Sequence, residues 1–241
     1  MRVIRGRAST PEDDREATRD LLDAVSESGE PAVRALTPHR QLAFGRRDAN
    51  EPGYDAARAA ASERGFPPVE RSVGGRAVAY TGTTVAFAAL EPTDDGRTGI
   101  TDRYEDAVGT VIDALDSLGV DAERGEPPES FCPGDYSVQA RCGGSDGEEF
   151  GKLAGIAQRV TADATLVSGV VIVADRGEIR EVLAPVYDAL DVPFDPESVG
   201  SVASAGGPAD SEPVARALED AIVGDRATTV ESLAEATGRE A

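Results

Sequence analysis

The order of strand-like and helix-like segments constrains the fold of this chain more than any other feature. Apolar residues recur at helical spacing over residues 11–28, 54–64, 101–118 and 178–190, and in two shorter runs at 212–223 and 229–236. Alternating or β-branched runs predict strands at 2–7, 31–36, 41–45, 69–71, 76–80, 83–90, 120–123, 136–141, 150–158 and 164–173. Because these strands do not alternate regularly with the helices, a doubly wound parallel sheet is disfavoured, and we expect an α+β fold.

Local signals place several boundaries. Thr10 and Pro11 predict the N-cap and first residue of a helix that ends at Gly29. A short turn at residues 81–82 separates two strand-like runs, so we expect residues 76–90 to form a hairpin. A segment rich in Pro, Gly and Ser at 192–212 is typical of a linker, which predicts a main domain over 1–191 and a short helical C-terminal extension over 192–241.

The charge balance excludes two classes of partner. The net charge is −21, and acidic residues are spread over every segment. Such a surface repels nucleic acid and anionic membranes, so we expect neither as a partner. Acidity combined with a near absence of lysine and many small apolar residues is typical of a salt-adapted, halophilic protein. No apolar run approaches the roughly 20 residues of a membrane helix, and the first residues lack a signal-peptide core, so we expect a cytoplasmic protein.

Cysteine and histidine usage argues against a metal site. The two cysteines, Cys132 and Cys142, lie in one loop-rich stretch, and a reducing compartment disfavours a disulfide between them. Since His39 is the sole histidine, a zinc site would need improbable partners, and we expect no metal. We interpret His39 as a turn residue rather than a catalytic base, and Cys142 as structural.

Lys152 is the only lysine in the chain, and the other 23 of the 24 basic residues are arginines. An ammonium is a compact charge with an adjustable pKa, whereas a guanidinium is a planar fork that stays protonated. Chance survival in an arginine-rich composition is the alternative explanation. The lysine nevertheless lies between Gly151 and Gly155, in a segment where a bulkier cation would fit poorly.

Two other segments carry candidate chemistry. Gly74 and Gly75, after Arg71, allow the backbone to approach a bound group closely because no Cβ intervenes. Cys132, before Pro133 and Gly134, is a thiol in a turn where backbone amides could favour the thiolate. Each feature alone has a plainer explanation, as a tight turn or an inert thiol.

Together and in this order, the three segments resemble the biotin/lipoate A/B protein ligase family. Residues 71–87, RSVGGRAVAYTGTTVAF, are similar to the family's arginine, double-glycine and hairpin motif, and residues 151–159, GKLAGIAQR, to its lysine motif. The resemblance implies a central, mostly antiparallel sheet flanked by helices, with an acyl chain in a tunnel beneath the glycine loop. It also implies catalytic residues Cys132 and Lys152, with the substrate-binding residues Arg71, Gly74, Gly75, Arg76, Ala77, Gly151, Gly155 and Ala157.

Cys132 favours one branch of the family. Residues 131–138, FCPGDYSV, are similar to the segment that holds the nucleophilic cysteine of lipoyl amidotransferases. That similarity implies transfer of an octanoyl or lipoyl group, through a Cys132 thioester and without a cofactor, to a lysine of a lipoyl-domain carrier protein. Such carriers are the glycine cleavage H protein and the 2-oxoacid dehydrogenase E2 type. Lys152 would lower the pKa of the thiol and hold the carbonyl oxygen as negative charge develops on it.

Two alternatives stay open. In an ATP-dependent lipoate ligase, which requires ATP and Mg, Lys152 would bridge the carbonyl and phosphate oxygens of an acyl-adenylate, and Cys132 would be incidental. A non-catalytic accessory protein that binds lipoyl groups is the other. The acidic run at 146–149 is most simply a solvated hairpin tip.

Overall fold

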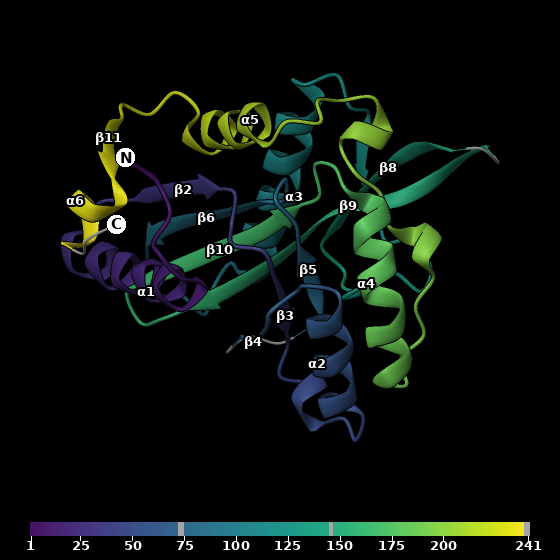
Figure 1. Ribbon diagram of the computed structural model, residues 1–241. Coiled ribbons are helices and arrows are strands. Elements are labelled where there is room, and N and C mark those ends of the chain that lie inside the picture. Colours follow the sequence, from purple (N-terminus) through teal and green to yellow (C-terminus); the bar gives the residue numbers. More distant parts are fainter. Residues whose placement is uncertain (72–74, 145–146, 239–241) are drawn as a thin grey trace.

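The computed structural model describes residues 1–71, 75–144 and 147–238 (Figure 1). Its strands form an eight-stranded sheet, hereafter the main sheet, and a three-stranded sheet, hereafter the small sheet. The main sheet runs in the order β11 (Thr229–Ser232), β1 (Arg2–Arg5), β2 (Ala32–Leu36), β6 (Val85–Pro92), β10 (Ala164–Val171), β9 (Gly147–Val160), β8 (Ser137–Gly144) and β7 (Ala122–Arg124). The small sheet has the order β4 (Pro68–Glu70), β3 (Gln41–Phe44) and β5 (Val78–Tyr80).

The main sheet is mostly antiparallel. Strand β1 is parallel to both β11 and β2, whereas each neighbouring pair from β2 to β7 is antiparallel. The expected α+β fold with a central, mostly antiparallel sheet flanked by helices is therefore confirmed.

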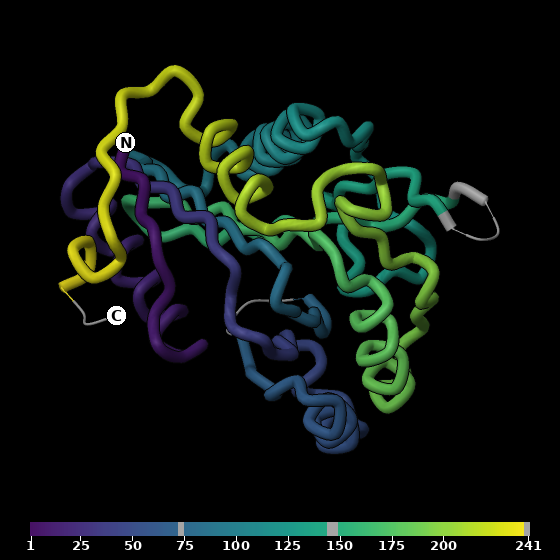
Figure 2. Tube along the Cα trace, turned by 45° about the horizontal axis from the view of Figure 1, so that its top comes forward, coloured from purple at the N-terminus to yellow at the C-terminus, as the bar shows by residue number. Residues whose placement is uncertain are grey.

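Helices cover both faces of the main sheet (Figures 1 and 2). Helix α1 (Pro11–Ser28) packs on one face, where its apolar residues share a core with Ala88 and Leu90 of β6. Helices α3 (Ile100–Asp116) and α5 (Ser211–Val223) cover the opposite face, with Val85 and Phe87. The alternation along β6 is what a strand buried on both faces requires, because successive side chains point to opposite sides.

The small sheet has a core of its own with α2 (Tyr54–Glu63) and α4 (Arg176–Ala189). Phe44 of β3, Phe66 and Tyr187 of α4 are buried in this core. Phe131, next to Cys132, belongs to the same core. The cysteine turn is therefore packed on the small-sheet side of the molecule.

The boundaries predicted for the first helix are confirmed. The Thr10 side chain accepts a hydrogen bond from the N–H of Asp13, and Pro11 occupies the first turn, where it loses no helical hydrogen bond. Gly29 ends the helix with a φ of 69°, a left-handed conformation that glycine adopts without steric cost.

The predicted hairpin at residues 76–90 is wrong. Strand β5 pairs with β3 in the small sheet, whereas β6 pairs with β2 and β10 in the main sheet. The N–H of Thr81 donates to Oγ1 of Thr84, 3.0 Å away, and both threonines are buried. This turn redirects the chain from one sheet to the other instead of reversing it onto itself.

The prediction of a helix over residues 229–236 is wrong in its first half. Residues 229–232 form β11, parallel to β1, and only α6 (Leu233–Thr237) is helical. Thr229 and Val230 are β-branched and favour extended backbone, and Arg2 of β1 forms an ion pair of 2.9 Å with Glu231 of β11. A capping box of Ser232 and Glu235 then begins α6.

Residues 192–212 contain two 3₁₀ turns, Pro196–Ser198 and Ala203–Ala205, and contribute side chains to the cores of both sheets. The N–H of Gly200 donates to the carbonyl of Lys152 at 3.1 Å, and Val199 and Val202 are buried. The division at residue 191 stays a prediction. Within the described residues, no helix is long and apolar enough to cross a membrane.

A buried ion pair joins α1 to the main sheet. Arg34 Nη2 lies 2.6 Å from Asp14 Oδ1, and the Arg34 side chain is 2% exposed. Replacing Asp14 by Ala leaves a buried guanidinium without its counter-charge, so we expect a loss of about 3 kcal/mol in the free energy of unfolding, measured by denaturant titration. The control is Glu12→Ala, which removes the exposed ion pair with Arg15 and should cost less than about 1 kcal/mol. Equal losses in the two variants would contradict the prediction.

Candidate active site

Cys132 lies in the turn between β7 and β8 with an unusual backbone conformation. Its φ is 43°, in the left-handed region that non-glycine residues rarely adopt. Its N–H donates to the hydroxyl of Tyr187 at 2.6 Å, and that hydroxyl donates to the carbonyl of Ala77 at 3.0 Å. Tyr187 thus links the cysteine turn to the segment that follows the glycine loop, and the packed surroundings stabilise a strained conformation.

Two donors face the sulfur. Cys132 Sγ lies 3.3 Å from the backbone nitrogen of Arg76 and 3.5 Å from Nη2 of Arg71. Gly75, which precedes Arg76, has a φ of 90°. A Cβ on Gly75 would stand 2.8 Å from Cys132 Sγ and 3.1 Å from Arg71 Nη2. Glycine is therefore required at this position, both for its backbone conformation and for the approach of the loop to the thiol.

Lys152 lies beneath the same turn, with its side chain 1% exposed. Nζ donates to the carbonyl oxygens of Phe131 at 3.0 Å and Cys132 at 2.9 Å, and to the two carboxylate oxygens of Glu126 at 3.0 and 3.1 Å. The ammonium therefore holds the backbone of the cysteine turn. The guanidinium within hydrogen-bonding distance of the sulfur belongs to Arg71.

The burial of these groups shifts their ionisation. Burial lowers the pKa of Lys152 below its usual value, against the opposing effects of Glu126 and Cys132. Burial also works to lower the pKa of Arg71, but the charge and hydrogen bond of Cys132 and the charge of Tyr80 outweigh it, and the pKa is raised. The pKa of Tyr187 is well above its usual value because burial disfavours a phenolate, so its hydroxyl stays protonated.

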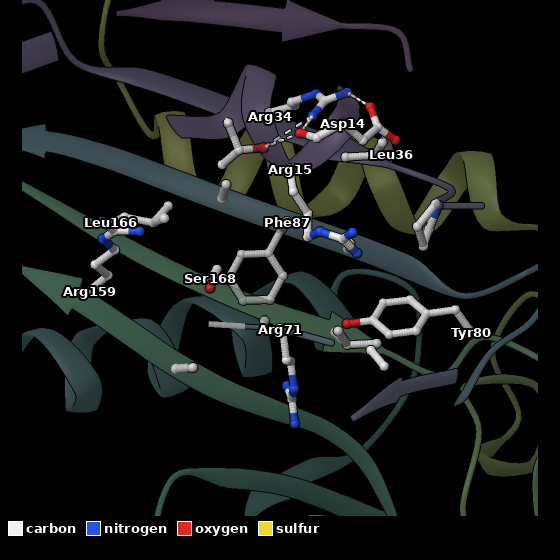
Figure 3. Close-up of a pocket in the computed structure, with 18 of the residues that line it drawn as sticks. Asp14, Arg15, Arg34, Leu36, Arg71, Tyr80, Phe87, Arg159, Leu166 and Ser168 are labelled. Carbon is white, nitrogen blue, oxygen red and sulfur yellow. Dashed lines mark hydrogen bonds and ion pairs between the residues drawn. The ribbon is translucent and has the colours of Figure 1, made fainter. Parts of the chain in front are cut away.

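A cavity of about 280 Å³ lies between α1 and the main sheet, and Arg71 and Tyr80 are at one end of it (Figure 3). Small and apolar residues of β6, β9 and β10 line it, namely Ala86, Ala88, Gly155, Ala157, Leu166, Ser168 and Val170. A Cβ on Gly155 would stand 3.5 Å from Cε of Lys152. Arg71 therefore links the cavity to the surroundings of Cys132, and Gly155 of its lining lies beside the Lys152 side chain.

Three of the described residues that line this cavity have a buried polar atom without a hydrogen-bond partner. Among the described residues, Arg34 Nε, Gln41 Oε1 and Arg71 Nε are buried and make no hydrogen bond. Buried polar groups in folded proteins are nearly always hydrogen-bonded.

The structure brings most of the residues implied by the resemblance to one place. Arg71, Gly75 and Arg76 surround the sulfur, the Ala77 carbonyl accepts from Tyr187, and Lys152 supports the turn from below. The cavity is lined by Gly155 and Ala157. Gly74 lies outside the described residues.

Three other residues from the sequence analysis lie away from the sulfur. A Cβ on Gly151 would stand 2.6 Å from Cα of Gly200 and 3.0 Å from Sγ of Cys142, so this glycine allows residues 198–202 to pack on β9. Cys142 is buried in the core beneath α3. Nε2 of His39 lies 2.8 Å from the carbonyl of Ala8, an arrangement that suits a turn residue. In the described part of the chain, no group of three or more His, Cys, Asp or Glu side chains is placed to hold a metal ion.

Sequence reasoning missed three residues of the site: Tyr187, Glu126 and Asp48. Tyr187 lies on α4, 55 positions from Cys132, and Glu126 is 26 positions from Lys152. Asp48 contacts the guanidinium of Arg76. None of the three belongs to a local motif. The one signal that could have pointed to Glu126 is that the chain's only lysine, once buried, requires a carboxylate partner.

Comparison with known families places this fold among the acyl-attaching enzymes. The chain belongs to the lipoyl protein ligase A/B catalytic domain family, whose model matches residues 11–221. Among curated proteins, it is 28% identical over 173 residues to an octanoyl-[GcvH]:protein N-octanoyltransferase of Exiguobacterium sp.. That alignment covers 71% of this chain and 59% of the relative, so the chain spans less than two thirds of the relative's length.

Two solved structures share the fold at low identity. The crystal structure of lipoate-protein ligase A bound with ATP matches with a TM-score of 0.76 and 18% identity, over 98% of this chain and 90% of that one. A bi-partite lipoate protein ligase from Thermoplasma acidophilum, studied with its E2 lipoyl domain, matches with a TM-score of 0.69 and 17% identity, over 98% and 88% of the two chains. The expected biotin/lipoate ligase-like fold is thus confirmed.

Because Lys152 is the only lysine, labelling the protein with ¹⁵N-lysine gives one side-chain resonance, whose pH titration measures its pKa directly. We expect a pKa below the ordinary value of 10.5, because burial disfavours the ammonium. Glu126→Gln removes the opposing carboxylate and should lower the pKa further.

The same shift predicts how stability depends on pH. Between the lowered pKa of the folded state and 10.5, the unfolded chain binds more protons than the folded one at Lys152. This residue's contribution to the free energy of unfolding therefore rises with pH across that window, and the rise should be absent in Lys152→Met. A titration midpoint at or above 10.5 in the wild type would show the interpretation to be wrong.

Proposed function

We propose that this protein transfers an octanoyl or lipoyl group to a lysine of a lipoyl-domain carrier protein through a thioester on Cys132. The placement of the sulfur carries the proposal. Cys132 Sγ faces the N–H of Arg76 and the guanidinium of Arg71, and Arg71 also lines the cavity beside α1. A thiol next to a buried cation and a backbone donor, beside an apolar cavity, suits an acyl-thioester enzyme.

The reaction exchanges one amide for another in two steps. The Cys132 thiolate attacks the carbonyl carbon of an acylated lysine on the donor, the C–S bond forms, the C–N bond breaks, and the departing amine takes up a proton. The neutral amine of the acceptor lysine then attacks the thioester, so that the C–S bond breaks, the thiolate is released and a proton leaves the new amide nitrogen. Because an amide is broken and an amide is formed, no nucleotide is consumed.

The surrounding residues have two roles: some stabilise charge on the sulfur, and others hold the turn that carries Cys132. Arg71 and the Arg76 N–H stabilise negative charge on the sulfur before the first step and again at the end of the second step, when the thiolate is released. Lys152, through the carbonyls of Phe131 and Cys132, and Tyr187, through the Cys132 N–H, keep the turn in its left-handed conformation. This assignment gives Lys152 a supporting role in place of the direct contact with the acyl oxygen that the sequence suggested.

The cavity suits an apolar acyl chain. Leu166, Val170 and the alanines of β6 and β9 form its walls. Burial contributes roughly 0.8 kcal/mol for each methylene, so the six methylenes of an octanoyl chain supply about 5 kcal/mol. This burial would favour binding of the acyl chain before the thioester forms and its placement in the cavity afterwards.

The proposed partners are lipoyl-domain carriers, either a glycine cleavage H protein or an E2 type. The name of the curated relative specifies GcvH, and the archaeal ligase was studied with an E2 lipoyl domain. The acidic, lysine-poor composition supports activity in a salt-rich cytoplasm.

An ATP-dependent lipoate ligase is the second candidate, because the fold matches that of a ligase bound with ATP. In that reaction Lys152 would have to leave Glu126 to reach an acyl-adenylate. ATP with Mg would replace the acylated donor, and Cys132 would be dispensable.

Incubation with an octanoylated H protein separates the two candidates. In the absence of ATP, we expect intact-protein mass spectrometry to show an octanoyl adduct on the enzyme that hydroxylamine removes. The adduct should be missing in Cys132→Ser, and transfer to an acceptor lipoyl domain should fall at least 1,000-fold in that variant, because a hydroxyl is a far weaker nucleophile than a thiolate.

Cys142→Ser is the matched control, since it removes the buried second thiol and should retain the adduct. Carrier acylation that requires ATP and survives in Cys132→Ser would refute the thioester proposal and support the ligase.

A further inference from the structure

Asp48 is a fully buried carboxylate that neither step of the proposed reaction uses. It lies at the start of a short 3₁₀ turn, η1 (Asp48–Asn50), directly after β3, and is 0% exposed. Burying an ionised carboxylate is unfavourable, and this one has a raised pKa, because burial outweighs the hydrogen bonds to Gly45 and Arg76 and the charges of Arg76 and Arg71. An ionised Asp48 therefore requires hydrogen bonds and positive charges close to its carboxylate.

We propose that Asp48 is a positioning residue for the thiol site, which holds the peptide unit between Gly75 and Arg76 against Cys132 Sγ. The inference deepens the proposed function, since it concerns the environment of the sulfur that the reaction uses. It does not depend on which acyl group or carrier the enzyme takes.

The carboxylate contacts two groups that flank that peptide unit, the backbone of Gly45 and the side chain of Arg76. Oδ2 accepts the N–H of Gly45 at 2.9 Å, and Oδ1 lies 3.3 Å from Nη1 of Arg76. Glu51 Oε1, at 2.7 Å, is the second acceptor of the same guanidinium nitrogen but is partly exposed and makes no bond to Gly45. Asp48 thus joins the side chain of Arg76 to Gly45, the residue that follows β3.

Gly45 completes the connection. A Cβ on Gly45 would collide with the carbonyl group of Gly75 and would stand 3.3 Å from the nitrogen of Arg76. The peptide unit between residues 75 and 76 therefore lies in direct contact with Gly45 on one side, and its N–H faces Cys132 Sγ on the other. Fixing Gly45 and the Arg76 side chain fixes the orientation of the N–H that stabilises the thiolate.

This role predicts a particular sign for the effect of Asp48→Asn. Removing a negative charge near the sulfur would, by electrostatics alone, favour the thiolate and lower the pKa of the thiol. Releasing Arg76 and its N–H acts in the opposite direction. If positioning dominates, the substitution raises the pKa of the thiol, which neither a pure charge effect nor a remote structural role does.

The test measures the rate of Cys132 alkylation by iodoacetamide from pH 5 to 10 in full-length protein carrying Cys142→Ser. For Asp48→Asn, we expect the midpoint of the pH profile to rise and the rate at neutral pH to fall about tenfold, equivalent to one unit of pKa. The matched control, Glu51→Gln, removes an acceptor from the same guanidinium but leaves Gly45 held, and should shift the midpoint far less.

A double-mutant cycle with Arg76→Met tests whether the effect passes through Arg76. In the double variant, the shift caused by Asp48→Asn should be reduced, because the guanidinium is already absent. Thermal unfolding of every variant checks that the folded state is being measured, and Asp48→Glu supplies a charged variant if Asp48→Asn does not fold.

An unchanged or lowered midpoint in a folded Asp48→Asn, or one matched by Glu51→Gln, would overturn the inference. Iodoacetamide needs no acyl donor. Failure of the proposed function would therefore appear as a missing octanoyl adduct in a protein whose alkylation still responds to Asp48.

Discussion

The Lys152 ammonium connects the two parts of the molecule, and the thiol site depends on that connection. Lysine 152 is part of β9 in the main sheet, whereas the carbonyls of Phe131 and Cys132 belong to a turn packed in the core of the small sheet. A buried ammonium is unfavourable unless several acceptors surround it. Here Glu126 and the two carbonyls converge on one nitrogen. An ammonium directs its three protons outward from one nitrogen atom, whereas a guanidinium spreads its donors over a larger planar group, so a lysine suits acceptors that converge on one point.

Two cations beside Cys132, Arg71 and Lys152, act in chemically distinct ways. Arg71 is next to the sulfur, where an ion that stays protonated is an advantage, since the pKa of arginine is above the working range of any enzyme. Lys152 is next to neutral carbonyls, where geometry matters more than permanence of charge. Cys132 therefore receives its electrostatic environment from one cation and its backbone conformation from the other. The two roles would be indistinguishable from the sequence alone, because both residues belong to motifs of the same resemblance.

Local patterns predicted most of the helices and strands, since caps, glycine stops and apolar spacing are local properties. They failed where pairing partners are distant. Residues 76–90 have strand, turn and strand signals, but β5 and β6 join different sheets, and β11 forms at residues 229–232 because β1 lies beside it. The site shows the same division. Motif residues such as Gly75 and Cys132 could be predicted, whereas Tyr187, Glu126 and Asp48 act across the fold. Gly151 belongs to the lysine motif, but the reason for a glycine there is packing, because a Cβ would collide with Gly200 and crowd Cys142.

After the turn at residues 81–84 the chain enters the main sheet, and the cavity beside α1 is lined by residues of both sheets. Arg71 and Tyr80 reach it from the small-sheet side, and β6, β9 and β10 form its floor (Figure 3). Arg71, Arg76 and Tyr187 contact Cys132 from the small-sheet side, while Lys152 contacts it from the main sheet. A separation of the two sheets would therefore widen the cavity and break contacts of the Cys132 turn at the same time. The packing of the two sheets and the surroundings of Cys132 are consequently determined by the same contacts.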